Sequence, residues 1–193
     1  MAEVPTEKIQ KVAVIGAGQA GRRFALRCAS AGFSVTLEDV MPANLRRAQT
    51  EFADLSGTMG AGAMSFALTV EDAVREADIA VDFVPDELES KLEIFCLIDR
   101  IAPPKTILCT PSESLSITDL ASCTYRSDRC FAVRGDLATG TDVRLLHPEA
   151  AASDVLLRTA KFFESAGFVV VVEGDPDAPM LMKNRKSASM PLG

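Results

Sequence analysis

The chain has 193 residues, a formal net charge of −7 and five cysteines. This length suits one domain with a sizeable core, or one domain with a short appendage. The acidic balance argues against nucleic acid as a partner, because nucleic-acid binding rests on basic patches. The apolar runs have the length of strands, far below the roughly twenty residues of a membrane-spanning helix, so we also expect no membrane association.

The first ten residues are polar and include Glu3 and Glu7, which is not the pattern of a secretory signal peptide. The cysteines are scattered through apolar segments, are odd in number and show no Cys-x-x-Cys spacing. Such thiols are typical of small buried residues in a reducing compartment. We therefore expect a cytoplasmic protein and predict no metal site.

A glycine-rich turn follows an apolar, β-branched segment at residues 11–15 and leads into an amphipathic helix pattern. This is the context of the dinucleotide fingerprint G-x-G-x-x-G. Gly16 allows a tight turn, Gly18 lets the backbone approach a pyrophosphate, and Gly21 lets the helix pack close to the strand. The pyrophosphate then lies on free N–H groups at the positive helix end. The alternative is a glycine turn that binds nothing.

A second predicted strand, residues 33–37, ends in Glu38 and Asp39, roughly twenty residues after the glycines. An acid at this spacing accepts hydrogen bonds from the adenosine ribose and repels a 2′-phosphate. The sequence therefore predicts an NAD(H) site, with Asp39 as its acid. The residues predicted to contact the cofactor are Gly16, Gly18, Gln19, Ala20, Gly21, Asp39, Val84 and Pro85.

Beyond Asp39, helix and strand patterns alternate as far as residue 172. This alternation predicts an α/β fold of the Rossmann type, a doubly wound, mostly parallel sheet with helices on both faces. The glycines at positions 57, 60 and 62 indicate a loop, because no strand runs into them. Helices are predicted at 42–55, 71–76, between Pro85 and Pro103, at 116–122 and at 153–166, and strands at 65–70, 79–84, 106–110, 130–133 and 168–172.

The pattern of regular elements ends near residue 174. We predict a Rossmann domain in residues 1–174. Residues 175–193 contain Pro176 and Pro179, then become basic, and are interpreted as a linker or as the start of a further helical domain.

Several segments together resemble the NAD-binding domain of the 3-hydroxyacyl-CoA dehydrogenase family. They are residues 11–21, 77–89, 94–95, 99–104, 106–108, 114–118, 128–129, 177–179 and 184–185. The resemblance implies NAD as the cofactor and hydride transfer between it and a 3-hydroxyacyl-CoA or a related hydroxy acid. It also implies a second, helical domain that completes the acyl-CoA cleft and makes most of the dimer contact. We therefore expect a homodimer, or a partner chain that supplies this domain.

The chain departs from the family where the chemistry should be. The family uses a histidine, oriented by a glutamate, as general base, and a serine and an asparagine contact the reacting oxygen. In register, these four positions hold Arg134, Leu146, Glu113 and Asn184. A guanidinium stays protonated and has no acceptor lone pair, so Arg134 cannot be the base. His147 neighbours the glutamate position; we interpret it as a strand-end or surface residue, the alternative being a small shift of the alignment.

Glu113 and Arg134 differ from the family at positions that face each other in its site. We therefore predict an ion pair between them. The alternative is a rebuilt site, in which Arg134 grips the carboxylate or phosphate of a substrate and Glu113 acts as base. Pairing with Arg134 would lower the basicity of Glu113, which counts against that alternative. Glu113, Arg134 and Asn184 are the candidate catalytic residues, and an acyl-CoA or a small carboxylate is the expected substrate.

Two functions fit these observations. The first is an NAD-dependent oxidoreductase with an atypical active site. The second is a non-catalytic NAD(H)-binding module, such as a redox sensor or a partner subunit, which explains the intact cofactor half and the lost base with one assumption. The fold and the fingerprint cannot choose between them, because function depends on the site.

Overall fold

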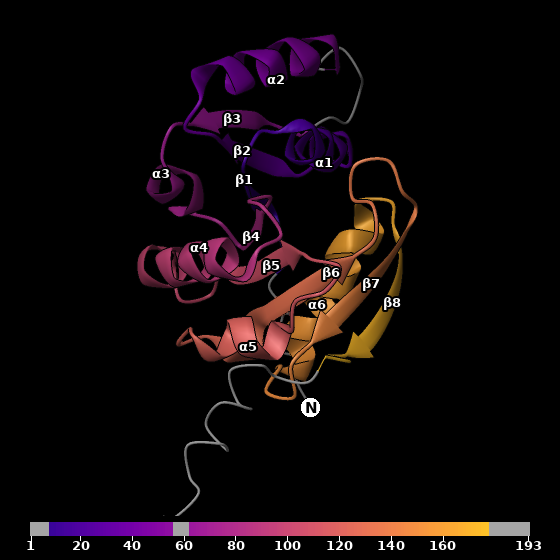
Figure 1. Cartoon of the computed structure of the whole chain (residues 1–193). Helices are drawn as coiled ribbons and strands as arrows, with labels where there is room; N and C mark the ends of the chain where they lie inside the picture. The colour runs from indigo at the N-terminus through magenta and orange to yellow at the C-terminus, as the bar shows by residue number, and fades with distance from the viewer. Residues whose placement is uncertain (1–7, 56–61, 178–193) are drawn as a thin grey trace, which may run out of the picture.

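The computed structural model describes residues 8–55 and 62–177. Within these ranges eight strands form one sheet in the order β3-β2-β1-β4-β5-β6-β7-β8 (Figure 1). Neighbouring strands are parallel except β6 and β7, which are antiparallel. The strands are β1 Lys11–Ile15, β2 Ser34–Glu38, β3 Met64–Ala67, β4 Ile79–Asp82, β5 Ile107–Pro111, β6 Cys130–Arg134, β7 Asp142–His147 and β8 Val169–Gly174. The helices are α1 Gln19–Ser30, α2 Pro42–Leu55, α3 Val70–Val74, α4 Leu88–Ile101, α5 Ile117–Ser122 and α6 Ser153–Ser165, with a 3-10 turn, η1, at Ser127–Arg129.

Helices cover both faces of the sheet, which confirms the predicted doubly wound α/β fold. Along β1, Val12 and Val14 face one core, to which α1, α2 and α6 contribute. Ala13 and Ile15 face the other core, built with α3, α4 and α5. Strands buried on both faces read as continuous apolar runs, which explains why residues 11–15 are so uniformly apolar.

The order of the strands reverses at β1, which pairs with β2 on one side and β4 on the other. Ile15 lies opposite both Glu38 of β2 and Asp82 of β4. Ligands of open α/β sheets bind outside the carboxyl ends of the strands at such a switch point. The fold therefore places the glycine turn and the residues that follow β2 and β4 at one edge.

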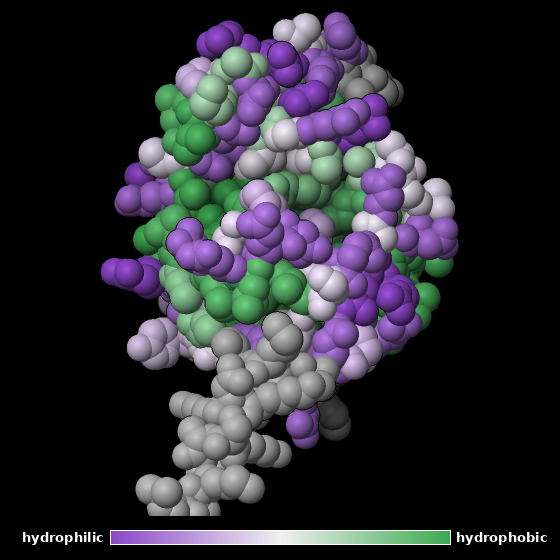
Figure 2. Space-filling model, viewed as in Figure 1, coloured by the Kyte–Doolittle hydropathy of each residue, from purple (hydrophilic) through white to green (hydrophobic). Residues whose placement is uncertain are grey.

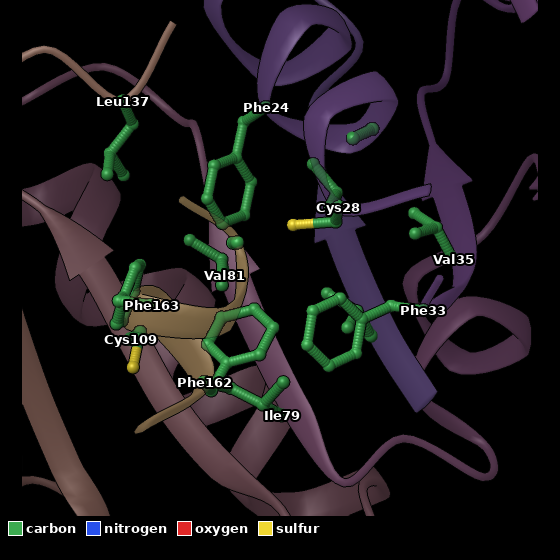
Figure 3. Close-up of a cluster of buried hydrophobic side chains, with 14 of the residues drawn as sticks. Phe24, Cys28, Phe33, Val35, Ile79, Val81, Cys109, Leu137, Phe162 and Phe163 are labelled. Atoms are coloured by element: carbon green, nitrogen blue, oxygen red, sulfur yellow. The ribbon is translucent and has the colours of Figure 1, made fainter. Parts of the chain in front are cut away.

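An aromatic cluster fixes α1 against the sheet and against α6. In Figure 3, Phe24 and Cys28 project from α1 toward Val81 of β4. Phe162 of α6 lies at ring-centroid distances of 6.4 Å from Phe24 and 5.0 Å from Phe33, edge to face in both cases. This packing holds the helix that begins at the glycine turn in a defined position over the sheet.

Strand β7 is absent from the sequence prediction, whereas the other elements agree within a few residues. Its signal was a short alternation, in which Val143 and Leu145 are buried while Asp142 and Arg144 are exposed. The loop of residues 135–141 between β6 and β7 is too short for a crossover helix, so β7 returns antiparallel to β6. Strand β8 then pairs in parallel with β7 and ends at Gly174, where the predicted Rossmann domain ends.

Residues 178–193, including Asn184 and Pro179, lie outside the described residues. The division into a domain of residues 1–174 and a following segment of residues 175–193 therefore stays a prediction.

Candidate functional site

The glycine turn follows β1 directly. Gly16 has a φ of +97°, a conformation that favours glycine, and its N–H donates to the carbonyl of Glu38 over 2.9 Å. A Cβ on Gly21 would lie 1.9 Å from the carbonyl oxygen of Gly16, so this position needs a glycine for helix and strand to pack. A Cβ on Gly18 would meet nothing within 4 Å. The turn thus leaves open space at Gly18, where a pyrophosphate would approach.

The N-terminus of α1 is available to an anion. Its N-cap is Gly18, which provides no side-chain capping hydrogen bond, and the first turn contains no acidic residue. Gln19 and Ala20 are exposed. The first N–H groups of a helix lack partners within the helix and carry partial positive charge. These N–H groups fit the diphosphate of a dinucleotide.

Asp39 follows β2 and is bonded directly to the glycine turn. Its Oδ2 accepts from the N–H of Ala17 over 2.9 Å and from the side chain of Asn44 over 3.0 Å, and its Oδ1 accepts from the N–H of Met41 over 2.7 Å. A carboxylate offers about four lone-pair sites, so capacity for a further donor remains. Asp39 therefore has the position and the charge that a ribose hydroxyl requires.

Glu38 lies beside Asp39 but is buried. Burial raises the pKa of Glu38, and the charge of Asp39 raises it further. The two adjacent acids therefore differ in exposure. Asp39 is half-buried at the edge of the sheet and is the one open to a ligand.

The end of β4 lies on the side of the glycine turn opposite to β2. The N–H of Phe83 donates to the carbonyl of Ile15 over 2.7 Å, and the Phe83 Cβ would lie 3.4 Å from a Cβ on Gly21. Val84 is half-buried and Pro85 is exposed, so both predicted residues lie at this edge.

A buried ion pair at the end of β4 is not part of the sequence prediction. Lys91 of α4 donates to Asp82 Oδ1 over 2.7 Å, and each side chain is 1% exposed. Burial raises the pKa of Asp82, while the charge of Lys91 opposes that rise. The available signal was a lysine on the apolar face of α4, between Leu88 and Phe95. The pair fixes α4 to the carboxyl end of β4.

The loops that follow β4, β5 and β6 are joined by two hydrogen bonds. The N–H of Glu113 donates to Asp86 Oδ2 over 3.0 Å, and Glu113 Oε1 accepts from the N–H of Gly135 over 3.0 Å. Glu113 is exposed. Hydrophobic residues interrupted by hydrophilic ones extend across the middle of the face seen in Figure 2.

The predicted ion pair between Glu113 and Arg134 is wrong. Arg134 pairs instead with Asp177, through Nη2 and Oδ2, while Glu113 accepts from the backbone of Gly135. The reason is that the chain after β8 returns to this edge and brings an acid 43 positions away onto the guanidinium. Arg134 and Glu113 are thus neighbours along this edge without being partners.

Leu146, at the glutamate position, and its neighbour His147 lie at the end of β7. Leu146 is fully buried in the second core. His147 ends β7, as predicted, and its Nδ1 lies 3.0 Å from the carbonyl oxygen of Pro148. In the described ranges, no three His, Cys, Asp or Glu side chains gather as a metal site would require. None of the helices in those ranges combines the length and apolarity needed to span a membrane.

The chain is similar to dehydrogenases. Residues 11–134 match the family model described as "3-hydroxyacyl-CoA dehydrogenase, NAD binding domain". A probable 3-hydroxybutyryl-CoA dehydrogenase of Bacillus subtilis is 34% identical over 139 residues, which are 65% of this chain and 48% of that protein. A 5-formyl-3-hydroxy-2-methylpyridine 4-carboxylate 5-dehydrogenase of Mesorhizobium japonicum is 30% identical over 122 residues, 58% of this chain and 40% of that protein. The chain thus spans about half the length of these curated relatives.

Solved structures agree with the fold. A diketoreductase superposes with a TM-score of 0.78 at 24% identity, covering 94% of this chain and 72% of that one. A 3-hydroxyacyl-CoA dehydrogenase of Archaeoglobus fulgidus superposes with a TM-score of 0.74 at 24% identity, covering 93% and 60%. Because the family model covers most of the sheet, from β1 to β6, this chain belongs to the 3-hydroxyacyl-CoA dehydrogenase family and carries its NAD-binding domain.

Proposed function

We propose that the chain acts as an NAD(H)-dependent oxidoreductase of the 3-hydroxyacyl-CoA dehydrogenase type with an atypical active site. The substrate is a 3-hydroxyacyl-CoA or a related hydroxy acid. The observation that carries the proposal is the hydrogen bond from Ala17 to Asp39, which joins the glycine turn and the ribose-binding acid at the switch point of the sheet. Among relatives, one is named for a 3-hydroxybutyryl-CoA and another for a pyridine carboxylate.

In this proposal the residues have distinct tasks. Gly16 and Gly21 shape the turn, and the N–H groups of Gly18, Gln19 and Ala20 receive the pyrophosphate. Asp39 accepts hydrogen bonds from the ribose, and Val84 and Pro85 line the cofactor on the side of β4. A bound NAD supplies the hydride acceptor or donor.

Glu113 is the proposed proton acceptor for the hydroxyl of the substrate. Its carboxylate is exposed at the carboxyl end of β5 and is held by the N–H of Gly135. Its partner there is the backbone amide of Gly135 and not the guanidinium of Arg134, which pairs with Asp177. Asn184 stays a candidate contact to the reacting oxygen.

The test follows NADH absorbance with acetoacetyl-CoA and, separately, with free acetoacetate at micromolar protein. Wild type, Asp39→Ala and Glu113→Gln are compared, with NADH binding measured separately on each. We expect turnover in the wild type, weaker NADH binding with slower turnover in Asp39→Ala, and loss of turnover with retained NADH binding in Glu113→Gln. Equal turnover in Glu113→Gln would remove Glu113 from the mechanism.

A non-catalytic NAD(H)-binding module is the second candidate. It is favoured by Arg134 and Leu146, which stand where the family has its histidine and glutamate and cannot replace them. NADH binding without turnover of acetoacetyl-CoA or of free acids would support it, as would association with a partner chain or a second copy. In either case we propose a cytoplasmic setting, since all five cysteines are free thiols.

A further inference from the structure

Arg134 is a buried cation whose hydrogen-bonding capacity is only partly used. Its side chain is 10% exposed, and its Nη2 donates to Asp177 Oδ2. Its Nε is buried and has no hydrogen-bond partner among the described residues. A guanidinium presents two parallel N–H groups to a carboxylate, so a carboxylate that binds both Nε and Nη2 would fit better than Asp177 does.

Asp177 can leave Arg134 without releasing the chain around it. We name residues 175–177 the exit segment. Its anchor is Asp175, whose Oδ2 accepts from Ser116 Oγ over 2.7 Å and from the N–H of Thr118 over 2.8 Å. Asp177 itself is 39% exposed, and among the described residues its other hydrogen bond runs from its N–H to Asp175 Oδ1 over 3.1 Å. Asp177 therefore meets Arg134 from the solvent side, whereas Asp175 holds the exit segment on α5.

We propose that Arg134 binds the free carboxylate of a hydroxy-acid or oxo-acid substrate, and that Asp177 takes the place of that carboxylate while no substrate is bound. The inference rests on the proposed function and deepens it by naming the substrate class. A buried guanidinium is costly without an anionic partner, so Asp177 can be displaced only by another anion. A free carboxylate meets that condition. The neutral carbonyl of a thioester does not.

The position of Arg134 agrees with a substrate site. It ends β6 at the carboxyl edge of the parallel strands, where open α/β sheets bind ligands. The next residue, Gly135, holds the exposed carboxylate of Glu113. The proposed proton acceptor is thus hydrogen-bonded to the residue that directly follows Arg134 in the chain.

The neighbouring strand supplies matched controls. Arg144 of β7 lies opposite Arg134 in the sheet and pairs with Glu173 of β8 over 3.3 Å. This second arginine–acid pair has the same chemistry, and its arginine is more exposed, at 48% against 10% for Arg134. Arg144→Gln and Glu173→Ala therefore repeat the charge changes of Arg134→Gln and Asp177→Ala at a neighbouring pair, without removing either residue of the proposed site.

The experiment titrates 3-hydroxybutyrate and its neutral amide into the protein by calorimetry, with and without NADH. We expect the acid to bind at least about tenfold more tightly than the amide, and Arg134→Gln to remove that difference. Asp177→Ala removes the competing carboxylate and should raise the affinity for the acid by about tenfold. Both control variants should keep the preference for the acid over the amide. Asp177→Asn, which keeps the volume of the side chain, repeats the measurement if Asp177→Ala does not fold.

Other results would overturn the inference. If Asp177→Ala and Asp177→Asn lower the melting temperature but leave the affinity for the acid unchanged, the contact is only an anchor for the exit segment. Equal binding of the acid and the amide by the wild type would show that Arg134 does not bind the carboxylate of a substrate. NADH binding by the wild type together with an Arg134→Gln variant that still prefers the acid to the amide would leave the proposed oxidoreductase intact while rejecting Arg134 as the carboxylate site. Loss of NADH binding in the wild type would instead reject the proposed function.

Discussion

The N–H of Ala17 donates to Oδ2 of Asp39 over 2.9 Å, a contact between two residues 22 positions apart. The hydrogen bond makes the glycine turn and the acid one unit before any ligand arrives. Because Met41 and Asn44 also donate to this carboxylate, its orientation is fixed. A ribose that binds there meets a preorganised acceptor, which reduces the cost of ordering the site.

Asp39→Ala should weaken NADH binding by roughly 1–3 kcal/mol, because it removes charge-assisted hydrogen bonds to the ribose. The same change should narrow the preference for NADH over NADPH, since the repulsion of a 2′-phosphate disappears. Both affinities can be measured by cofactor fluorescence. Asp54→Ala, an exposed acid on α2, is the control. Unchanged affinity for NADH would mean that Asp39 does not hold the ribose.

Two glycines of the turn should respond differently to alanine. At Gly18 the new Cβ has open space and φ is −61°, so the fold should tolerate Gly18→Ala while NADH binding falls at least about tenfold. At Gly21 the new Cβ would lie 1.9 Å from the carbonyl oxygen of Gly16, which must cost about 1–3 kcal/mol or more of stability. Urea unfolding and NADH titration of both variants separate the two roles. A large stability loss in Gly18→Ala would contradict this division.

The parts of the site that the sequence could predict are local. The turn, the strand before it and the acid after β2 are each encoded within a few residues, and continuous apolar runs such as residues 11–15 identify strands buried on both faces. Pairings between distant residues are different. Arg134 pairs with Asp177 and not with Glu113 because the chain after β8 returns to this edge of the sheet. No residue spacing in the sequence predicts that return.

Strand β7 and the pair of Lys91 with Asp82 were missed for related reasons. The alternation in β7 covers few residues, and one more apolar residue, Leu146, interrupts it. Lys91 lies among the apolar positions of α4, but a lysine is rarely buried, so its side chain is expected to reach solvent. The buried partner of Lys91 is Asp82 at the end of β4, and this pairing is visible only in the folded structure.

Lys91→Met should destabilise the protein strongly, by about 3–5 kcal/mol, because it leaves Asp82 buried without a countercharge. The double variant Lys91→Met/Asp82→Leu should recover much of this loss, since it removes both charges from the core. Chemical unfolding of both variants and of the wild type measures the effect. If Lys91→Met were as stable as the wild type, the pair would not hold α4 to β4.

The five thiols should react at very different rates. Cys28, Cys109 and Cys130 are buried, and burial raises the pKa of each thiol, to about 12 for Cys130. Cys123 is exposed and Cys96 is half-buried. The thiolate is the reactive form, so a thiol reagent should modify Cys123 first in the native protein and the buried three only after unfolding. Cys123→Ser should remove the fast phase; a fast phase that persists would contradict the burial of the others.

The anchor of the exit segment should make part of the stability depend on pH. Burial alone would raise the pKa of Asp175, but hydrogen bonds from Thr118 and Ser116 outweigh it and hold the pKa below its usual value of 3.8. The native state therefore binds this proton more weakly than the unfolded chain does. The contribution of Asp175 is fully present above about pH 5 and is lost as the pH falls through the lowered native pKa.

Comparison of the wild type with Asp175→Asn by urea unfolding between about pH 3 and pH 7 isolates that contribution, because acid effects common to both proteins cancel. The variant should be less stable near neutral pH, and the difference should shrink toward pH 3. Glu164→Gln, an exposed acid of α6 that lies away from the exit segment, controls for the loss of one charge. A difference that stays constant across this range would show that the charge of Asp175 does not hold the exit segment on α5.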